Sequence, residues 1–518
     1  MKNIKLFLAT MLILVWSACE DDLDQAPLSN PSAANFFRNT SDFEKAVNGI
    51  YNALNPNPTV ADGSQAINGY AIRRFELSEI RSDNVYSPGT GVRDWNAINN
   101  FEKTLATNPN MNEAWYANYL GILRANTVLD NLNATVVPDE AVRNQMEGEA
   151  KFLRAFFYFD LIRWFGKVPL IDHAVTIEEA LIIPRSSVED VYTLVISDFT
   201  DAIGKLPETY PAASKGRATS VAAKAFLGLV YLTRTGDTYG VEGPGLGTNE
   251  YTEAVSLFNE VIASGKFSWV PDYASIFSYT NEGNPDIVFD IQSIGGNAGD
   301  LGVGARFPSE IYDGAYGLAI ALGFPGGADT DSPKAPSKNL QSSYEAGDVR
   351  YTFSILPSYV NLAGSNVTTG QFKKFLDASK KGADRFNWPI NYPVLRYTDI
   401  LLMKAEAILR GGFGGLGTQQ DVDDIVNMVR TRAGLANVSS TSLDMLLLER
   451  RHEFAGEGLR WHDLVRSGKI LEIMAAWDAV DDAENKIKPM TVDEILYPIP
   501  QTQLTISPGL YDQNPGYN

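Results

Sequence analysis

The only cysteine in the 518-residue chain is Cys19, and it ends a stretch that is typical of a bacterial lipoprotein export signal. Two lysines precede the apolar run Leu6 to Trp16, which is too short to span a bilayer, and small residues follow it. We predict that residues 1–18 are removed and that Cys19 carries a lipid anchor; the alternative is an ordinary signal peptide followed by an incidental cysteine. Because no cysteine is left for a disulfide, burial of an apolar core must hold the fold together.

Composition favours one large globular domain on a short tether. The chain is 44% apolar and 11% aromatic, and no second apolar run of membrane length follows the leader. No linker divides it after an acidic stretch at residues 19–31, so we expect a tether there and a single domain over 32–518. With 43 basic and 63 acidic residues the net charge is −20, which makes nucleic acid and anionic lipid poor partners.

Apolar residues recur at helical spacing over much of the chain. The clearest long helices are expected from Asn112 to Leu132 and from Asp139 to Phe165, where Gly166 stops the second. Another helix should begin at Ser187, because acidic residues at positions 189 and 190 suit the positive end of a helix dipole.

Two further couples of helices resemble tetratricopeptide units. They are expected at Ser220–Thr235 with Glu250–Ser264 and at Tyr397–Arg410 with Asp421–Arg432, where small residues face bulky ones. Unrelated helical hairpins would give a similar pattern. We therefore predict a mainly α fold, with a scaffold of tetratricopeptide-like helix pairs over about 111–265 and 394–470.

Two stretches, about 55–110 and 266–393, break the helical rhythm. Both are rich in Gly, Pro, Asn and aromatic residues, and the second contains a plausible strand, Ile287 to Ile291. Long irregular loops on a rigid scaffold are where ligand contacts tend to lie. We predict that these loops, with a few short strands, carry the binding face.

The usual catalytic motifs are missing from the sequence. The segment that starts at His452 lacks the second histidine of a zinc protease helix, and no nucleophile elbow or phosphate loop appears. Gly412 to Gly417 matches a dinucleotide fingerprint but follows a helix, so we interpret it as an interhelical loop. We predict a protein that is not an enzyme and has no cofactor and no metal site. A pair of glycosidase carboxylates remains an open alternative.

The most charged segment runs from Glu449 to Arg466, where acids and bases alternate at helical spacing. Arg450, Arg451 and Arg460 could form an anion site. We favour an ion-pair network that locks the last helices onto the body, because each base has an acid within reach.

Several blocks in this chain resemble the SusD/RagB family of outer-membrane nutrient-binding lipoproteins. The charged segment resembles the family's C-terminal signature, and KFLRAFFYFDLIRWFGKVPL at 151–170 resembles its central helix. The mature start at 19–27, LRYTDILLMKAEA at 395–407 and QNPGY at 513–517 add three more blocks in family order.

This resemblance implies both a fold and a function. It implies four tetratricopeptide-like helix pairs, and a lipid-anchored protein on the outer face of the outer membrane of Bacteroidota. Such a protein closes over a partner, a SusC-like TonB-dependent transporter, and passes captured oligosaccharide to it without cleavage. The acids at 20–22 resemble surface-export tags. Peptides are the alternative ligand within the family, and a surface glycoside hydrolase is the competing reading from another class.

A glycan site needs exposed aromatic rings flanked by planar polar groups. The best concentration of both lies in the first irregular stretch. We predict Trp95 as a stacking platform, Arg81, Asp83 and Asn96 as hydrogen-bonding groups, and Tyr86 as a further contact. The alternatives are a core position for Trp95 and a simple turn at Asp83.

The second irregular stretch supplies the expected opposing wall of the site. Its predicted ligand contacts are Tyr279, Arg306 and Tyr316, with Tyr312 as an additional candidate. Trp388 is expected to pack beneath the helix that follows it instead of contacting ligand.

Overall fold

The computed structural model describes most of the chain. Its described residues are 36–55, 69–89, 94–297, 304–311, 334–360, 366–382 and 387–517. The expected leader and tether, with Cys19, lie outside these ranges, and so do Tyr312 and Tyr316. Within the described ranges, no helix is both long enough and apolar enough to cross a bilayer.

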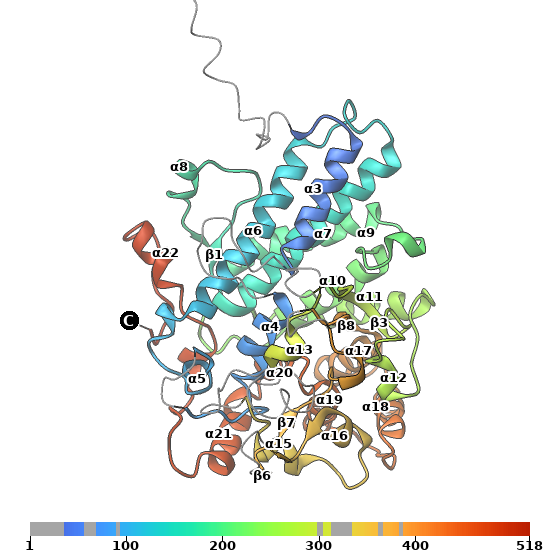
Figure 1. Ribbon diagram of the computed structural model, residues 1–518, viewed down its shortest axis with the longest axis vertical. Coiled ribbons are helices and arrows are strands. Elements are labelled where there is room, and N and C mark those ends of the chain that lie inside the picture. Colours follow the sequence, from blue (N-terminus) through green and yellow to red (C-terminus); the bar gives the residue numbers. More distant parts are fainter. Residues whose placement is uncertain are drawn as a thin grey trace, which may run out of the picture.

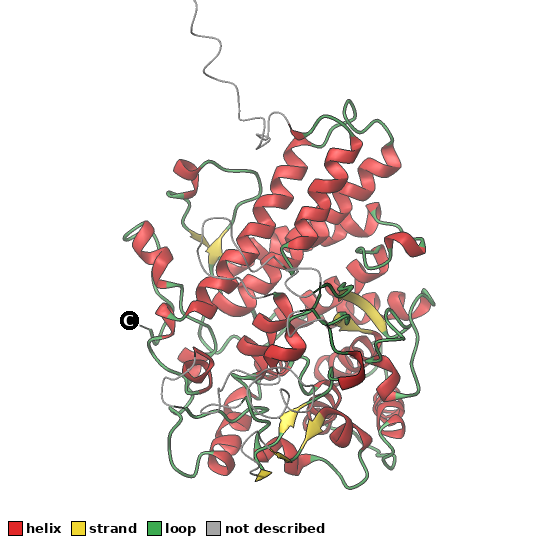
Figure 2. Ribbon diagram, viewed as in Figure 1, coloured by secondary structure: helices red, strands yellow, loops and turns green. Residues whose placement is uncertain are grey.

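Helices dominate the structure, as predicted (Figures 1 and 2). Each scaffold helix packs on the next one along the chain, from α3 on α6 through to α17 on α18. These helices are α3 (Thr40–Asn52), α6 (Pro109–Asn131), α7 (Glu140–Phe165), α9 (Val188–Lys205), α10 (Ser220–Arg234), α11 (Tyr251–Ala263), α17 (Tyr397–Gly411) and α18 (Gln419–Arg432). The predicted tetratricopeptide-like scaffold is confirmed.

Local sequence signals explain where these helices begin and how closely they pack. The Ser187 hydroxyl accepts a hydrogen bond from the Asp190 N–H and caps α9, as expected. A Cβ atom at Gly228 of α10 would lie 2.6 Å from the ring of Phe258 in α11. The small residue therefore permits the close approach of the two helices, and a larger one would push them apart.

The core between these helices is aromatic. The rings of Phe152 in α7, Phe226 in α10 and Phe289 meet edge to face, with centroids 5.2–5.9 Å apart. Phe289 belongs to β3 (Ile287–Ile291), the predicted strand, which is confirmed. Strand β3 pairs antiparallel with β8 (Tyr392–Arg396), which leads directly into α17. This pairing connects the second irregular stretch to the helical scaffold.

The remaining elements are mostly shorter than the scaffold helices. Most of them lie in the lower half of the molecule as it is drawn in Figure 1. The strand pairs are β1 (Val168–Pro169) with β2 (Arg185–Ser186), β4 (Ile355–Leu356) with β7 (Gln371–Phe372), and β5 (Tyr359–Val360) with β6 (Asn366–Val367). The helices are α4 (Tyr70–Arg74), η1 (Phe75–Glu79), α5 (Asp94–Asn99), η2 (Leu105–Thr107), α8 (Ile177–Ala180), η3 (Ala212–Ser214), α12 (Tyr273–Ile276), α13 (Phe307–Ile311), α15 (Lys338–Ser343), α16 (Val349–Ser354), η4 (Ala378–Lys380), α19 (Leu443–Phe454), α20 (Arg460–Ser467), α21 (Ile470–Asp481), η5 (Val492–Glu494) and α22 (Gln501–Ile506).

The glycine-rich match at Gly412 to Gly417 joins α17 to α18. The backbones of Gly414 and Gly417 pair with each other in a tight turn, and a helix, α17, directly precedes the loop where the fingerprint needs a strand. The interpretation as an interhelical loop is confirmed.

The charged C-terminal segment forms the predicted ion-pair network. Arg450 bridges Asp399 of α17 at 2.7 Å and Asp463 of α20 at 2.9 Å, and Arg466 binds Glu406 of α17 at 2.7 Å. All of these side chains are buried. The network therefore ties α19 and α20 to α17, and its arginines are not available as an anion site.

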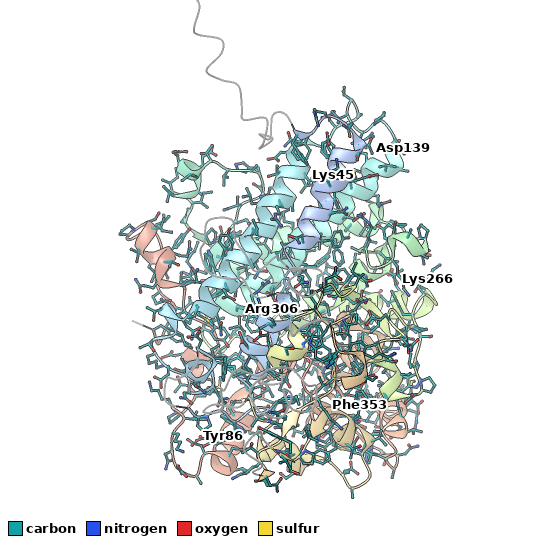
Figure 3. All side chains as sticks on the ribbon, in the orientation of Figure 1. Lys45, Tyr86, Asp139, Lys266, Arg306 and Phe353 are labelled. Carbon is teal, nitrogen blue, oxygen red and sulfur yellow. The ribbon has the colours of Figure 1, made fainter. Side chains whose placement is uncertain are left out.

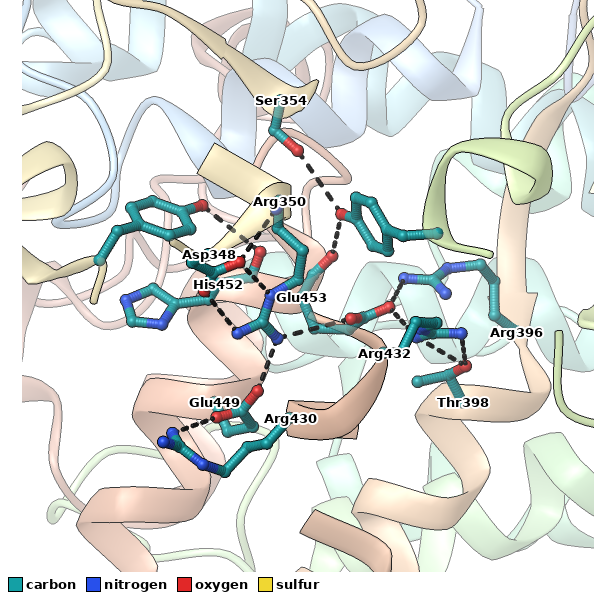
Figure 4. Close-up of polar contacts among 12 residues, drawn as sticks. Asp348, Arg350, Ser354, Arg396, Thr398, Arg430, Arg432, Glu449, His452 and Glu453 are labelled. Carbon is teal, nitrogen blue, oxygen red and sulfur yellow. Dashed lines mark hydrogen bonds and ion pairs between the residues drawn. The ribbon is translucent and has the colours of Figure 1, made fainter. Parts of the chain in front are cut away.

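A second part of the network centres on Glu453 of α19 (Figure 4). Its carboxylate accepts hydrogen bonds from Arg432 of α18 at 2.7 Å and from Arg396 of β8 at 2.9 Å. Arg350 lies 3.6 Å away. Burial alone would raise the pKa of Glu453, but these arginines outweigh it and lower the pKa to about 2.

This depressed pKa predicts a loss of stability in acid. Because the carboxyl has a higher pKa in the unfolded chain, its contribution is fully present above about pH 4.5 and is lost as the pH falls toward 2; the shift corresponds to roughly 3 kcal/mol. Urea unfolding at pH 6 and at pH 3.5 measures it. The stability gap between the wild type and Glu453→Gln should shrink at pH 3.5, and an unchanged gap would contradict the assignment.

Candidate functional site

A cleft of about 420 Å³ contains Tyr86, one of the predicted contact residues. We call it the Tyr86 cleft. It lies between the segment after η1, the start of α15 and the loops beside β6 and α21. Its lining residues are Tyr86, Ser87, Pro88, Gly89, Ala335, Pro336, Lys338, Gln341, Thr368, Thr369, Asp481 and Lys486.

Tyr86 is held in place from two sides. Its backbone N–H donates to Ala335 O at 3.0 Å, and its hydroxyl donates to Asp482 Oδ1 at 2.9 Å. The ring meets Trp477 of α21 edge to face, with centroids 6.4 Å apart. Burial and the Asp482 carboxylate raise the pKa of Tyr86, so the phenol stays protonated and the half-buried ring has a fixed orientation in the cleft.

Asparagines of α5 hold the floor of the Tyr86 cleft. Asn96 donates to Ser87 O at 2.9 Å, and Asn99 accepts from Ser87 N at 2.7 Å. Asn100 beside them donates to Gly89 O at 2.9 Å. Asn96 and Asn99 are fully buried. Asn96, predicted as a ligand contact, therefore acts as a positioning residue in this structure, because its amide nitrogen donates hydrogen bonds to the segment that lines the cleft.

We predict that Asn96→Ala loosens residues 87–89. Two hydrogen bonds to Ser87 disappear, which costs about 1–3 kcal/mol for buried groups left without a partner. Hydrogen exchange at 87–89 should become faster while exchange in α10 and α11 stays unchanged. Equal exchange at 87–89 in both proteins would rule out the positioning role.

A second group of side chains surrounds Trp95 of α5. The Lys334 ammonium lies 4.3 Å from the centre of the Trp95 ring, a cation–π distance. Lys334 is buried and also bonds Glu76 Oε1 at 3.1 Å and the backbone oxygen of Glu310 at 2.9 Å. Burial raises the pKa of Glu76, and Lys334 opposes that shift. Trp95 itself is half-buried. Its exposure is therefore intermediate between that of a stacking platform and that of a core residue, the two alternatives that the sequence left open.

The Tyr86 cleft and the Trp95 group adjoin through one stretch of chain. Lys334 precedes Ala335 and Pro336, which line the cleft and pair with the segment at Tyr86. Arg306, which directly precedes α13, joins the same group through its ion pair with Glu310 of that helix at 3.3 Å. Figure 3 labels Arg306 near the middle of the view and Tyr86 below it. The structure thus brings three predicted residues, Tyr86, Trp95 and Arg306, around residues 334–336.

Two predicted ligand contacts instead hold the fold. Arg81 is fully buried, donates to Glu494 O at 2.6 Å and stacks over Tyr497 at 4.1 Å. Asp83 is also fully buried and pairs with Arg451 at 3.0 Å and Arg460 at 2.8 Å. We therefore replace the predicted ligand role of both residues with a structural one, because a ligand cannot reach them without breaking these contacts.

The rest of the predicted opposing wall is only partly described. Tyr279 is half-buried, donates to Phe375 O at 2.9 Å and lies 6.5 Å from the Trp388 ring. Trp388 is buried, as expected. Tyr316 and Tyr312 lie outside the described residues. Tyr279 thus belongs to the wall around α13 and not to the Tyr86 cleft.

Sequence reasoning missed the lysines and threonines of the cleft. Lys338, Lys486, Thr368 and Thr369 are exposed and supply ammonium and hydroxyl groups beside the Tyr86 ring. They come from three distant parts of the chain and form no motif. An aromatic face with such donors and acceptors around it suits a neutral, hydroxyl-rich ligand. Among the described residues, no group of three or more His, Cys, Asp or Glu side chains could hold a metal ion.

Two family models match the chain. The SusD family model matches residues 331–517, and the SusD-like model described as starch-binding and associating with the outer membrane matches 28–232. Most of the helical scaffold and the C-terminal network lie within these ranges, whereas α11 falls between them. The chain is a SusD/RagB family protein, as its motifs predicted.

Relatives and solved structures agree with this assignment. A SusD-like protein of Bacteroides ovatus is 28% identical over 90% of this chain and 82% of its own length. A surface glycan-binding protein A from Bacteroides fluxus shares the fold at 22% identity, covering 92% of this chain and 99% of its own, with a TM-score of 0.75. A laminarin-binding SusD-like protein is 25% identical over 93% of this chain and 100% of its own, with a TM-score of 0.70.

Proposed function

We propose that this protein captures a glycan at the cell surface and delivers it, uncleaved, to a SusC-like TonB-dependent transporter. The observation that carries the proposal is the Tyr86 cleft in a SusD/RagB fold. Its fixed aromatic ring can stack on the apolar face of a sugar, and its lysines, threonines and glutamine can bond the vicinal hydroxyls. The Trp95 group and Arg306 extend this surface.

The cleft favours a glycan over a peptide. A peptide is recognised by backbone pairing and by apolar pockets for its side chains. The described lining of the cleft has one aromatic ring and few aliphatic groups, whereas polar side chains surround the rest of it. A glycoside hydrolase would need two carboxyl groups about 5 Å apart or slightly more, both facing the substrate. Asp481 is the acid among the described lining residues of the cleft, and its carboxylate accepts hydrogen bonds from the backbone N–H groups of Lys338 and Asn339.

The leader predicts the location. A lipid on Cys19 would hold the domain at the outer membrane, in agreement with the family description, and the acidic residues 20–22, which resemble surface-export tags, would place it on the outer face. The transporter partner rests on the family resemblance. We propose both together with the glycan ligand.

Affinity electrophoresis of residues 20–518 in gels that contain plant, algal and microbial polysaccharides tests the proposal. Laminarin comes first, because a 25% identical neighbour is named for binding it. Retardation by one polysaccharide, with no new products when that polysaccharide is chromatographed after incubation, is the expected result. Released oligosaccharides would overturn the non-enzymatic reading, and no retardation on any glycan would move the assignment to peptides.

A further inference from the structure

A second cavity, of about 370 Å³, lies on a different face of the molecule, between α6, α8 and α22. We call it the α6 groove. Trp115, Tyr116 and Tyr119 of α6 form one side, and Tyr511 closes one end. None of the described residues that line it is charged. Two of its lining residues, Ile177 and Ile506, are 76% and 60% exposed. An apolar patch of this kind marks a contact surface.

Several of the polar atoms inside the α6 groove are already used by the fold. The Tyr119 hydroxyl donates to Pro169 O at 2.7 Å, and the Ser507 hydroxyl donates to Leu181 O at 3.1 Å. The Asn126 amide donates to Ile171 O and accepts from Arg154. A sugar would find few partners for its hydroxyl groups here and would lose their hydration. The groove instead suits an extended peptide with aliphatic and proline side chains.

The chain itself contains such a peptide directly before its first described residue. Residues 25–35, QAPLSNPSAAN, carry no charge in a protein where one residue in five is charged. Two prolines, Pro27 and Pro31, favour an extended conformation that loses little entropy on docking, and aromatic-lined grooves are the surfaces that bind such segments. Leu28 lies between them.

The described chain begins close enough to the groove for this segment to reach it. Phe36 lies four residues before α3, and its neighbour Phe37 packs on Phe43 near the start of that helix, with ring centroids 4.6 Å apart. Helix α3 packs on α6, where Arg124 donates to Gly49 O at 2.7 Å. The separation is about 22 Å along the two helices (about 14 Å from Gly49 to the start of α3 and about 8 Å along α6 to the groove) and about 10 Å across one helix diameter, which is about 24 Å in a straight line. Eight extended residues, from Leu28 to Phe36, span up to about 27 Å.

We propose that the segment around Pro27 and Leu28 docks in the α6 groove and holds the folded domain close to the lipid anchor at Cys19. A free segment would leave 17 residues, or up to about 58 Å, between Cys19 and Phe36. Docking at Leu28 shortens the free tether to the nine residues between Cys19 and Leu28, which span at most about 30 Å. The domain is then held with one side toward the membrane. This inference does not depend on which ligand the Tyr86 cleft binds.

Disulfide trapping in residues 20–518 tests the docking, because that protein has no cysteine of its own. Leu28→Cys is combined with Ile506→Cys at the groove rim, which is 60% exposed. The control combines Leu28→Cys with Lys45→Cys on α3, whose side chain is 66% exposed and lies on the helix that the segment enters. A free segment would meet position 45 at least as often as position 506, whereas a docked one would stay at 506.

Under mild oxidation with glutathione disulfide, we expect the 28–506 disulfide to form at least about tenfold faster than the 28–45 disulfide. Pro27→Gly or Tyr116→Ser should remove most of this preference without changing the urea midpoint of unfolding. Equal rates, or faster trapping at position 45, would overturn the proposal. A preference for 506 that survives both substitutions would also overturn it, because the groove contacts would then play no part.

Discussion

Asp83→Asn should destabilise the protein by about 3–5 kcal/mol, the typical cost of removing one partner from a buried ion pair. The Asp83 carboxylate is fully buried between the guanidinium groups of Arg451 and Arg460. Burial raises the pKa of Asp83, but these two arginines outweigh it and lower the pKa. The amide keeps the size of the side chain but leaves two buried positive charges without their counterion. Urea unfolding at pH 7 measures the change.

Asp172→Asn is the matched control. Asp172 also forms an ion pair, with His173 at 2.9 Å, but both side chains are largely exposed. Its substitution should change stability by less than about 1 kcal/mol. If Asp83→Asn instead left stability unchanged and abolished glycan binding, Asp83 would be a ligand residue, as its sequence context first indicated, and the structural assignment would be wrong.

Tyr86→Ala should weaken glycan binding about 10- to 100-fold, because aromatic anchors at the centre of a binding site typically contribute 1.4–2.8 kcal/mol. The ring is the aromatic surface of the Tyr86 cleft and its orientation is fixed by Asp482 and Trp477. Tyr86→Phe keeps the ring and loses only the hydroxyl, so we expect a smaller loss. Titration calorimetry with an oligosaccharide from the retained polysaccharide measures both.

Tyr116→Ala controls for the loss of an exposed tyrosine elsewhere. Tyr116 is 45% exposed and lines the α6 groove, away from the cleft. Its substitution should leave glycan affinity unchanged. A larger loss of glycan affinity in Tyr116→Ala than in Tyr86→Ala would indicate that the glycan binds in the groove. It would also contradict the docking of the N-terminal segment there.

The scaffold could be predicted from the sequence because its signals are local. Helical periodicity, the Ser187 cap and the stop at Gly166 predicted both ends of α7 and the start of α9 to within a residue. The ion-pair network could be anticipated because acids and bases alternate within one segment. Even so, the partners of Arg450 and Arg466 in α17 lie about 50–60 residues away and had no local signal.

The candidate site was harder to predict because residue type alone does not show burial. Arg81, Asp83 and Asn96 have the chemistry of sugar contacts, yet all three are buried, Arg81 and Asp83 by partners far away in the chain and Asn96 against the nearby Ser87. Asp83 meets arginines more than 360 residues away. Tyr86 stays half-exposed because Asp482 and Ala335 hold it at the edge of a cleft, and neither residue stands out in the sequence. Long-range contacts, not composition, separate the binding positions from the structural ones.

The central claim is that a glycan binds in the Tyr86 cleft. The most direct test is a crystal structure of residues 20–518 with an oligosaccharide derived from the polysaccharide that retards the protein. We predict an intact sugar ring stacked on Tyr86, with hydroxyl groups bonded to side chains of the cleft. Sugar density in the α6 groove, or a cleaved oligosaccharide in the cleft, would contradict this account.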